Sequence, residues 1–258
     1  MKQRVITGII FGIVVLTLLL SHDFGRLALL ILIPLFSVIE YSRMTNFAAK
    51  DWIIFFATCL GIFYLLFTGM ADPNYILVPI CFLNLLLIFN LFRKYPFIKH
   101  RKFKSIIAAL YLIAPFFIAY FLDLHSSSYF VLIGIVILIW VSDSSAYFVG
   151  SQIGKRKFFP SISPNKTWEG FYGSGMCVFI IAYVIASITQ FRELSFWILL
   201  ALIIWIAGAL GDLVASHVKR LHNIKDSGSL LPGHGGFFDR FDAFILVLPF
   251  VLLMLQIF

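Results

Sequence analysis

Charged residues are scarce in this sequence. Lys, Arg, Asp and Glu together make up 12% of its 258 residues, whereas hydrophobic residues make up 61%. A soluble domain usually carries about 25% charged residues. A soluble fold could not hide this much apolar surface. The composition therefore excludes a soluble globular protein and predicts a polytopic membrane protein.

Cysteine is also scarce, and a common nucleotide-binding motif is absent. The three cysteines, Cys59, Cys81 and Cys177, all lie in apolar runs without CxxC spacing, which excludes a disulfide framework. The GxxxxGK[ST] pattern of nucleotide-binding P-loops is absent.

No internal repeat or linker divides the chain. We expect one membrane domain over residues 1–258, with N-terminal helices over about 1–125 and catalytic helices and loops over about 126–258.

Long apolar runs, by contrast, follow one another along the whole chain. A membrane-spanning helix needs about 20 mostly apolar residues. The first run has a basic start but lacks a small-x-small cleavage site, so we expect an uncleaved span. The sequence thus predicts an all-α fold with about nine transmembrane helices, over residues 5–20, 24–40, 52–69, 75–92, 105–122, 128–149, 169–190, 195–215 and 238–257.

The basic residues alternate between the two sides of these spans. All but two of the 20 Lys and Arg residues fall at the N-terminus or in every second loop, and the exceptions are Arg26 and Arg192. The positive-inside rule then places the N-terminus and the crowded loops in the cytoplasm. The basic loop at 93–104 is expected to set topology and to attract anionic headgroups. The net charge of +8 therefore does not require a nucleic-acid partner.

One segment near the end of the chain, residues 216–242, is dense in charge although it lies between two predicted spans. Charged groups beside lipid are costly, so this segment is a functional-site hypothesis. Just before and inside it, Asp212, Ser216, Lys219 and Arg220 are spaced i, i+4, i+7 and i+8. On a helix this spacing gathers a carboxylate, a hydroxyl and two cations on one face. A plain salt bridge is the alternative interpretation.

Further acidic residues suggest a metal site. Asp239 and Asp242 are spaced i and i+3 at the start of the last span and share a helix face. Together with Asp212 they form a hard oxygen donor set that suits Mg²⁺. Asp143 lies in the sixth span among small residues, where it either contributes to this site or bonds a neighbouring helix.

Two loops offer donors for phosphate. Ser163, Lys166 and Thr167 precede a predicted helix, whose first amides attract anions. Glu169 follows in the first turn, where a carboxylate suits the helix dipole. In the second loop, Gly235 and Gly236 allow the backbone to approach a ligand closely, and the neighbouring His234 is either a turn residue or a phosphate donor. Carboxylates for a metal and cations for phosphates are the parts needed for phosphoryl or nucleotidyl transfer.

The charged segment also resembles a known signature. Its pattern, S-x-V-K-R-x-x-x-x-K-D-x-G-x-x-x-P-G-H-G-G-x-x-D-R-x-D, is similar to that of the phosphatidate cytidylyltransferases, also called CDP-diacylglycerol synthases, of bacterial type. The resemblance extends upstream through SPNKTWEG and through Asp143, and covers about residues 140–258. It implies a reaction of CTP with phosphatidic acid that gives CDP-diacylglycerol and pyrophosphate.

The resemblance also implies cofactors and partners. It predicts Mg²⁺, with a monovalent cation such as K⁺ alongside, held by Asp212 and Asp239 with Asp143 and Asp242 as further candidates. The expected partners are CTP, phosphatidic acid and the lipid bilayer, with no nucleic acid and with a homodimer left open. The expected location is the inner membrane, with the site facing the cytoplasm. We assign catalytic roles to Asp212, Asp239, Lys219 and Arg220, and substrate binding to Ser163, Lys166, Thr167, Ser216, Lys225, Asp226, His234, Gly235, Gly236 and Arg240.

The chain departs from the family's pattern at one position. Similar sequences often carry Glu three residues after the aspartate that matches Asp212, and this chain has Ala215 there. Either that Glu is dispensable, or metal affinity is altered, or the chain is a divergent paralogue. We favour the first interpretation, because every other polar position of the signature is intact. Three other functions are weighed: a CTP-dependent polyprenol or phytol kinase, an ion-coupled transporter, and a non-catalytic scaffold.

Overall fold

A computed structural model describes residues 2–93, 103–125, 129–228, 230 and 235–258, with side chains from residue 7 onward. The chain forms two compact units. The first comprises Met1–Tyr129 and Val218–Phe241, and the second comprises Phe130–His217 and Asp242–Phe258. Each unit therefore combines an earlier stretch of the chain with part of its C-terminal region.

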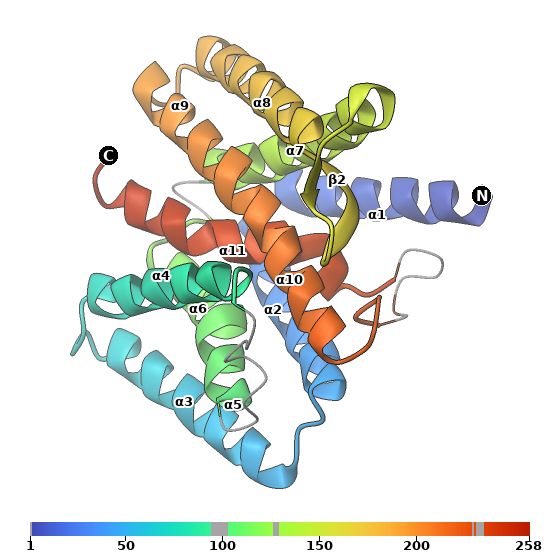
Figure 1. Cartoon of the computed structure of the whole chain (residues 1–258). Coiled ribbons are helices and arrows are strands. Elements are labelled where there is room, and N and C mark those ends of the chain that lie inside the picture. The colour runs from blue at the N-terminus through green and yellow to red at the C-terminus, as the bar shows by residue number, and fades with distance from the viewer. Residues whose placement is uncertain (1, 94–102, 126–128, 229, 231–234) are drawn as a thin grey trace. The chain divides into compact units, whose positions relative to one another are not determined.

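The first unit is built from helices that are apolar along most of their length (Figure 1). Helix α1 packs against α2, and α3 packs against the α5–η2–α6 segment. Their bounds are α1 Lys2–Leu20, α2 Asp23–Met44, α3 Ala49–Phe67, α4 Pro73–Asn90, α5 Lys104–Ile107, the π-helical turn η2 Ala108–Ile113, and α6 Ala114–Phe121.

The second unit contains the remaining helices and a short hairpin. Helix α8 packs along α9, as Figure 1 shows. The bounds are α7 Tyr129–Ile153, β1 Lys157–Phe159, β2 Ser163–Thr167, α8 Trp168–Thr189, α9 Leu194–Ile203, the π-helical turn η3 Ile204–Gly208, α10 Ala209–Leu221 and α11 Phe238–Leu255. The last residues of α10 and the first of α11 belong to the first unit.

The predicted all-α membrane fold is confirmed. Within the described residues, seven helices are long and apolar enough to cross a membrane. The two other predicted spans correspond to α1, whose described apolar part is the shorter Thr7–Leu20, and to α11, which carries Asp239, Arg240 and Asp242 near its start. The count of nine spans and the cytoplasmic N-terminus stay predictions.

One predicted span contains a π-helical turn with an identifiable cause. The segment Lys104–Phe121 is long and apolar enough to cross a membrane, and η2 lies in its middle. Pro115 is the second residue of α6, the helix that follows η2. Proline has no N–H, and its ring clashes with the carbonyl four residues earlier. We infer that the wider π turn relieves this clash while the helix continues.

The antiparallel β1–β2 hairpin is a feature that the sequence did not predict. Lys157 pairs with Thr167 and Phe159 pairs with Ser163. The sequence predicted the segment SPNKT only as a polar mouth to the next span. The structure makes it a strand that leads directly into α8 (Figure 1). This arrangement gives Lys166 a fixed backbone.

Lys104 forms a buried ion pair with Asp51 across 2.8 Å, with side chains 10% and 8% exposed. Its ammonium also donates to the carbonyls of Thr45 and Asn46. The other lysines of the basic loop, Lys94, Lys99 and Lys102, lie outside the described residues. Lys104 thus holds the connection between α2 and α3 rather than facing headgroups.

We expect Lys104→Met to lower the free energy of unfolding by about 3–5 kcal/mol, because it leaves the Asp51 carboxylate buried without its cation. The double variant Lys104→Met/Asp51→Asn should lose less stability, since it buries no unpaired charge. Thermal unfolding in detergent measures both. Equal losses in the single and double variants would contradict a buried ion pair at this position.

Candidate active site

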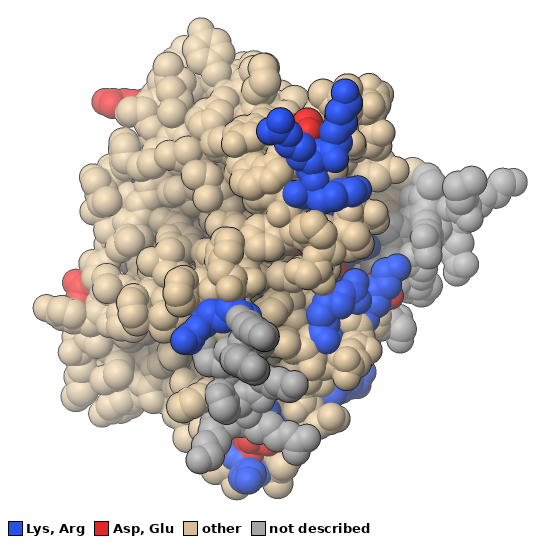
Figure 2. All heavy atoms as spheres, viewed as in Figure 1, with Lys and Arg blue, Asp and Glu red and all other residues tan. Residues whose placement is uncertain are grey.

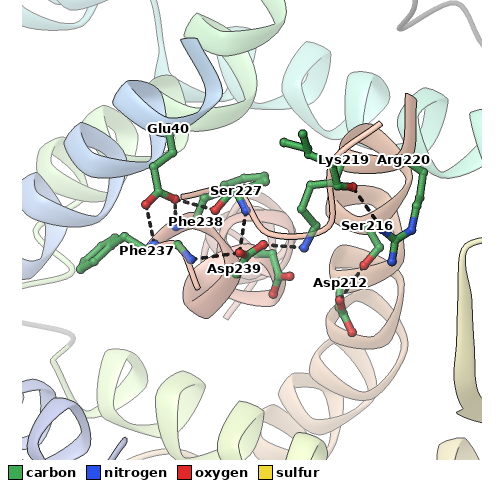
Figure 3. A network of polar contacts seen from close by, with 12 residues as sticks. Glu40, Asp212, Ser216, Lys219, Arg220, Ser227, Phe237, Phe238 and Asp239 are labelled. Carbon is green, nitrogen blue, oxygen red and sulfur yellow. Dashed lines mark hydrogen bonds and ion pairs between the residues drawn. The ribbon is translucent and has the colours of Figure 1, made fainter. Parts of the chain in front are cut away.

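Lys219 and Asp239 form a mostly buried ion pair in the first unit (Figure 3). The Lys219 Nζ and Asp239 Oδ1 atoms are 2.5 Å apart, and the side chains are 9% and 10% exposed. Lys219 comes from the last turn of α10 and Asp239 from the first turn of α11. Two residues given catalytic roles by the sequence are therefore in direct contact.

The other oxygen of Asp239 is held by backbone amides. Its Oδ2 accepts hydrogen bonds from the N–H groups of Ser227, at 2.8 Å, and Gly236, at 3.1 Å. Gly235 has a φ of +82°, and a Cβ at this position would lie 3.2 Å from Asp239 Oδ2. A side chain at position 235 would thus be strained in the backbone and crowded against the carboxylate. Asp239 has a defined orientation as a result.

A second carboxylate, which the sequence did not single out, lies in the same network. Glu40 is 1% exposed on α2. Its oxygens accept hydrogen bonds from the hydroxyl of Ser227 and from the amides of Phe237 and Phe238 (Figure 3). A signal was present in the sequence, because Glu40 is an acid at the end of an apolar run, where charge is costly.

In the second unit, Asp212 lies on α10 and interacts with a residue of the hairpin. The Lys166 Nζ is 2.7 Å from Asp212 Oδ2, with side chains 27% and 37% exposed. Lys166 also donates to the carbonyl of Ala209. Ser216, one helical turn after Asp212, donates to its Oδ1 at 3.2 Å. The structure thus brings together three residues that the sequence predicted for one site, one of them from a distant loop.

The base of the hairpin is held by two residues of the SPNKTWEG segment. Thr167 is buried, and its hydroxyl accepts a hydrogen bond from the Gly170 amide as the N-cap of α8. Glu169 accepts hydrogen bonds from the amides of Lys155 and Arg156. These contacts fix the hairpin against the start of α8. Substrate binding by Thr167 stays a prediction.

The remaining predicted residues differ in exposure. Asp242 is 7% exposed in α11, and its Oδ1 accepts a hydrogen bond from the amide of Ala243, whereas Ser163 is half-buried. His234 lies outside the described residues. Charged side chains are sparse on the face shown in Figure 2, as expected for a chain that meets lipid. The exposed members of the predicted set are Asp143, Arg220, Lys225, Asp226 and Arg240.

The donor chemistry around Asp212 and Asp239 suits a hard cation. Among the described residues, no group of three His, Cys, Asp or Glu side chains is arranged to hold a metal ion. Mg²⁺, however, usually keeps several waters and takes one or two carboxylates together with substrate phosphates. Asp212 and Asp239 are carboxylates of this kind, each placed beside a lysine. The residues therefore fit Mg²⁺ in donor type.

Position 215, where the chain departs from its signature, is fully buried. Ala215 has 0% exposure on α10. A carboxylate at the same place would lose its contact with water, which is costly without a partner. The small apolar side chain is thus compatible with the observed packing of α10.

Comparison with known proteins places this chain in one family. Residues 2–258 match the model of the cytidylyltransferase family. A phosphatidate cytidylyltransferase of Bacillus subtilis strain 168 is 34% identical over 273 residues, which cover 100% of this chain and 98% of the relative. The Staphylococcus aureus strain COL protein of the same name is 32% identical over 266 residues, and 99% of each chain is covered. The Staphylococcus saprophyticus protein is 33% identical, and 100% of each chain is covered.

Proposed function

The chain belongs to the cytidylyltransferase family, and we propose that it transfers a cytidylyl group from CTP to phosphatidic acid. The products are CDP-diacylglycerol and pyrophosphate. The observation that carries this proposal is similarity over the full length of enzymes named phosphatidate cytidylyltransferase. The protein thus acts as a nucleotidyltransferase in phospholipid biosynthesis.

Cytidylyl transfer requires that the reactants be positioned and their charge neutralised, but it does not require a general base. An oxygen of the phosphatidic acid phosphate bonds to the α-phosphorus of CTP. The bond from that phosphorus to the bridging oxygen breaks, and its electron pair leaves with pyrophosphate. A phosphate monoester has a second pKa of about 6 and is already ionised at pH 7. Charge on the phosphates must be neutralised while the reactants are held in line.

We assign metal binding to Asp212 and Asp239, with Asp143 and Asp242 as further candidates. This assignment comes from the sequence signature, and it is supported by the donor type, because carboxylate oxygens are ligands that Mg²⁺ prefers. Bound Mg²⁺ would neutralise phosphate charge and stabilise the leaving pyrophosphate. A monovalent cation such as K⁺ is proposed alongside it.

Phosphate binding is assigned to basic side chains. Lys219 and Lys166 each form an ion pair with a proposed metal ligand. Both lysines therefore already bind an anionic group in the structure. Arg220, Lys225 and Arg240 are exposed and carry cations that attract CTP. The amides of Ser227 and Gly236 already donate to Asp239, so we expect side-chain cations rather than these amides to bind the nucleotide.

The protein is a multi-pass membrane protein, and its substrates come from two phases. CTP is soluble and phosphatidic acid is a lipid, so the site must be open to water and to the bilayer. The basic loops support a cytoplasmic position for residues 216–242 by the positive-inside rule. We propose that the protein lies in the inner membrane, binds CTP from the cytoplasm and receives the lipid from the bilayer.

Transfer of label from CTP tests the reaction directly. With purified protein, Mg²⁺ and phosphatidic acid, label in the α-phosphate of CTP should appear in the lipid, and label in the γ-phosphate should appear in pyrophosphate. Omitting phosphatidic acid is the control, and a parallel reaction supplies a polyprenol in its place. If only γ-label reached a lipid alcohol, the chain would be a kinase and the proposed function would be wrong.

A further inference from the structure

Glu40 is a buried carboxylate whose position needs an explanation. It is 1% exposed in α2, and burying an ionised carboxylate is strongly unfavourable unless hydrogen bonds compensate it. Among the residues that the structure describes, its three donors are uncharged: the Ser227 hydroxyl at 2.6 Å, the Phe237 amide at 2.8 Å and the Phe238 amide at 2.9 Å. Glu40 is thus compensated by one loop and one helix start.

The two amides belong to the N-terminal end of α11, which begins at Phe238. The first amides of a helix have no partner within the helix, and a negative charge is favourable there. Glu40 satisfies two of these amides although it lies 197 and 198 residues earlier in the chain. It therefore acts as an N-terminal cap of α11 that is supplied by α2.

The loop is shaped to admit this carboxylate. A Cβ at Gly228 would lie 2.5 Å from Glu40 Oε1, and a Cβ at Gly236 would lie 2.3 Å from Glu40 Oε2. At either distance a Cβ could be present only if the Glu40 carboxylate or the backbone shifted. Glycine at positions 228 and 236 thus lets the backbone approach the carboxylate closely.

The same loop residues also orient Asp239. Ser227 donates its hydroxyl to Glu40 and its amide to Asp239. Gly236 donates its amide to Asp239, while the next two amides along the chain donate to Glu40. The two carboxylates therefore hold the same two loop ends (Figure 3). A change at Glu40 would move the amides that fix Asp239.

We propose that Glu40 is a positioning residue for Asp239, and that its buried carboxylate holds the loop in the geometry needed for turnover. This role rests on the proposed function, because it matters to catalysis only if Asp239 binds the metal. Glu40 lies in the first unit with the residues that it contacts. It is expected to affect the rate of cytidylyl transfer rather than the affinity for CTP.

Glu40→Gln is the central test. The amide has nearly the same shape, but its NH₂ group would face a donor N–H, so at least one buried donor would be left without an acceptor. We expect kcat to fall by about 10- to 100-fold, the equivalent of one unsatisfied buried group. The KM for CTP should change by less than about threefold, because ground-state binding is not the interaction removed. Hydrogen–deuterium exchange at residues 225–240 should become faster.

Two further variants keep the test decisive if Glu40→Gln folds poorly. Ser227→Ala keeps the carboxylate and removes one of its donors, so kcat should fall several-fold, up to about tenfold. Full kcat in folded Ser227→Ala would overturn the positioning role. Glu193→Gln makes the same chemical change at an exposed N-cap of α9 and should leave kcat and exchange at 225–240 unchanged.

The outcomes separate this inference from the proposed function. If the wild type makes no CDP-diacylglycerol, the proposed function fails. If the wild type is active and Asp239→Asn is inactive, but folded Glu40→Gln keeps full kcat, only the positioning role is wrong. A lower yield of folded Glu40→Gln with unchanged kcat per folded molecule would also overturn it, because the carboxylate would then serve stability alone.

Discussion

Asp239→Asn should lower the turnover of cytidylyl transfer by at least about 100-fold, as expected when a charged group that stabilises the transition state is lost. The substitution removes a proposed metal ligand. It also turns an NH₂ group toward at least one of the three donors that now contact the carboxylate, from Lys219, Ser227 and Gly236. Transfer of α-label from CTP to lipid measures the loss.

The structure predicts that this variant will also be less stable. The Lys219 and Asp239 side chains are 9% and 10% exposed, and removing one partner of a buried pair costs about 3–5 kcal/mol. Turnover must therefore be expressed per folded molecule, with folding followed by thermal unfolding in detergent. Asp72→Asn is the matched control: Asp72 caps α4 through the Asn74 amide, and Asn caps equally well. Near-normal turnover in folded Asp239→Asn would show that Asp239 is not a metal ligand.

Asp212→Asn should reduce turnover as strongly, by about 100-fold, but with little loss of stability. Its ion pair with Lys166 has side chains 37% and 27% exposed. Exposed pairs contribute up to about 1 kcal/mol, so the melting temperature should fall by no more than about 4 °C. This variant separates chemistry from folding, which Asp239→Asn cannot do.

Asp123→Asn is a suitable control for Asp212→Asn. Asp123 is 50% exposed beside His125, and its positive φ of 55° is a conformation that Asn adopts readily. Its turnover and melting temperature should match the wild type. If the Asp212→Asn protein has the wild-type melting temperature and transfers the label at the wild-type rate, Asp212 is not a metal ligand. This conclusion does not depend on the result for Asp239→Asn.

The helices were predictable because their cause is local. Each run of about 20 apolar residues suits a bilayer, and the predicted spans differ from the observed helices by a few residues at most of their ends. The acids at positions 212 and 239 were also visible, because a charge in an apolar chain stands out. The β1–β2 hairpin was not, since its strands of 3 and 5 residues are short and lack an alternating apolar pattern.

The sequence by itself determined the membrane class, the family signature and the candidate acids, because composition, run length and residue spacing are properties of the chain. Only the tertiary structure decided the partners. Lys166 meets Asp212 across 46 residues of sequence separation, and Ser227 meets Glu40 across 187. No local pattern encodes such contacts. The donors that stabilise a buried charge are set by tertiary packing. For Glu40 they come from a loop and from the start of a helix near the other end of the chain.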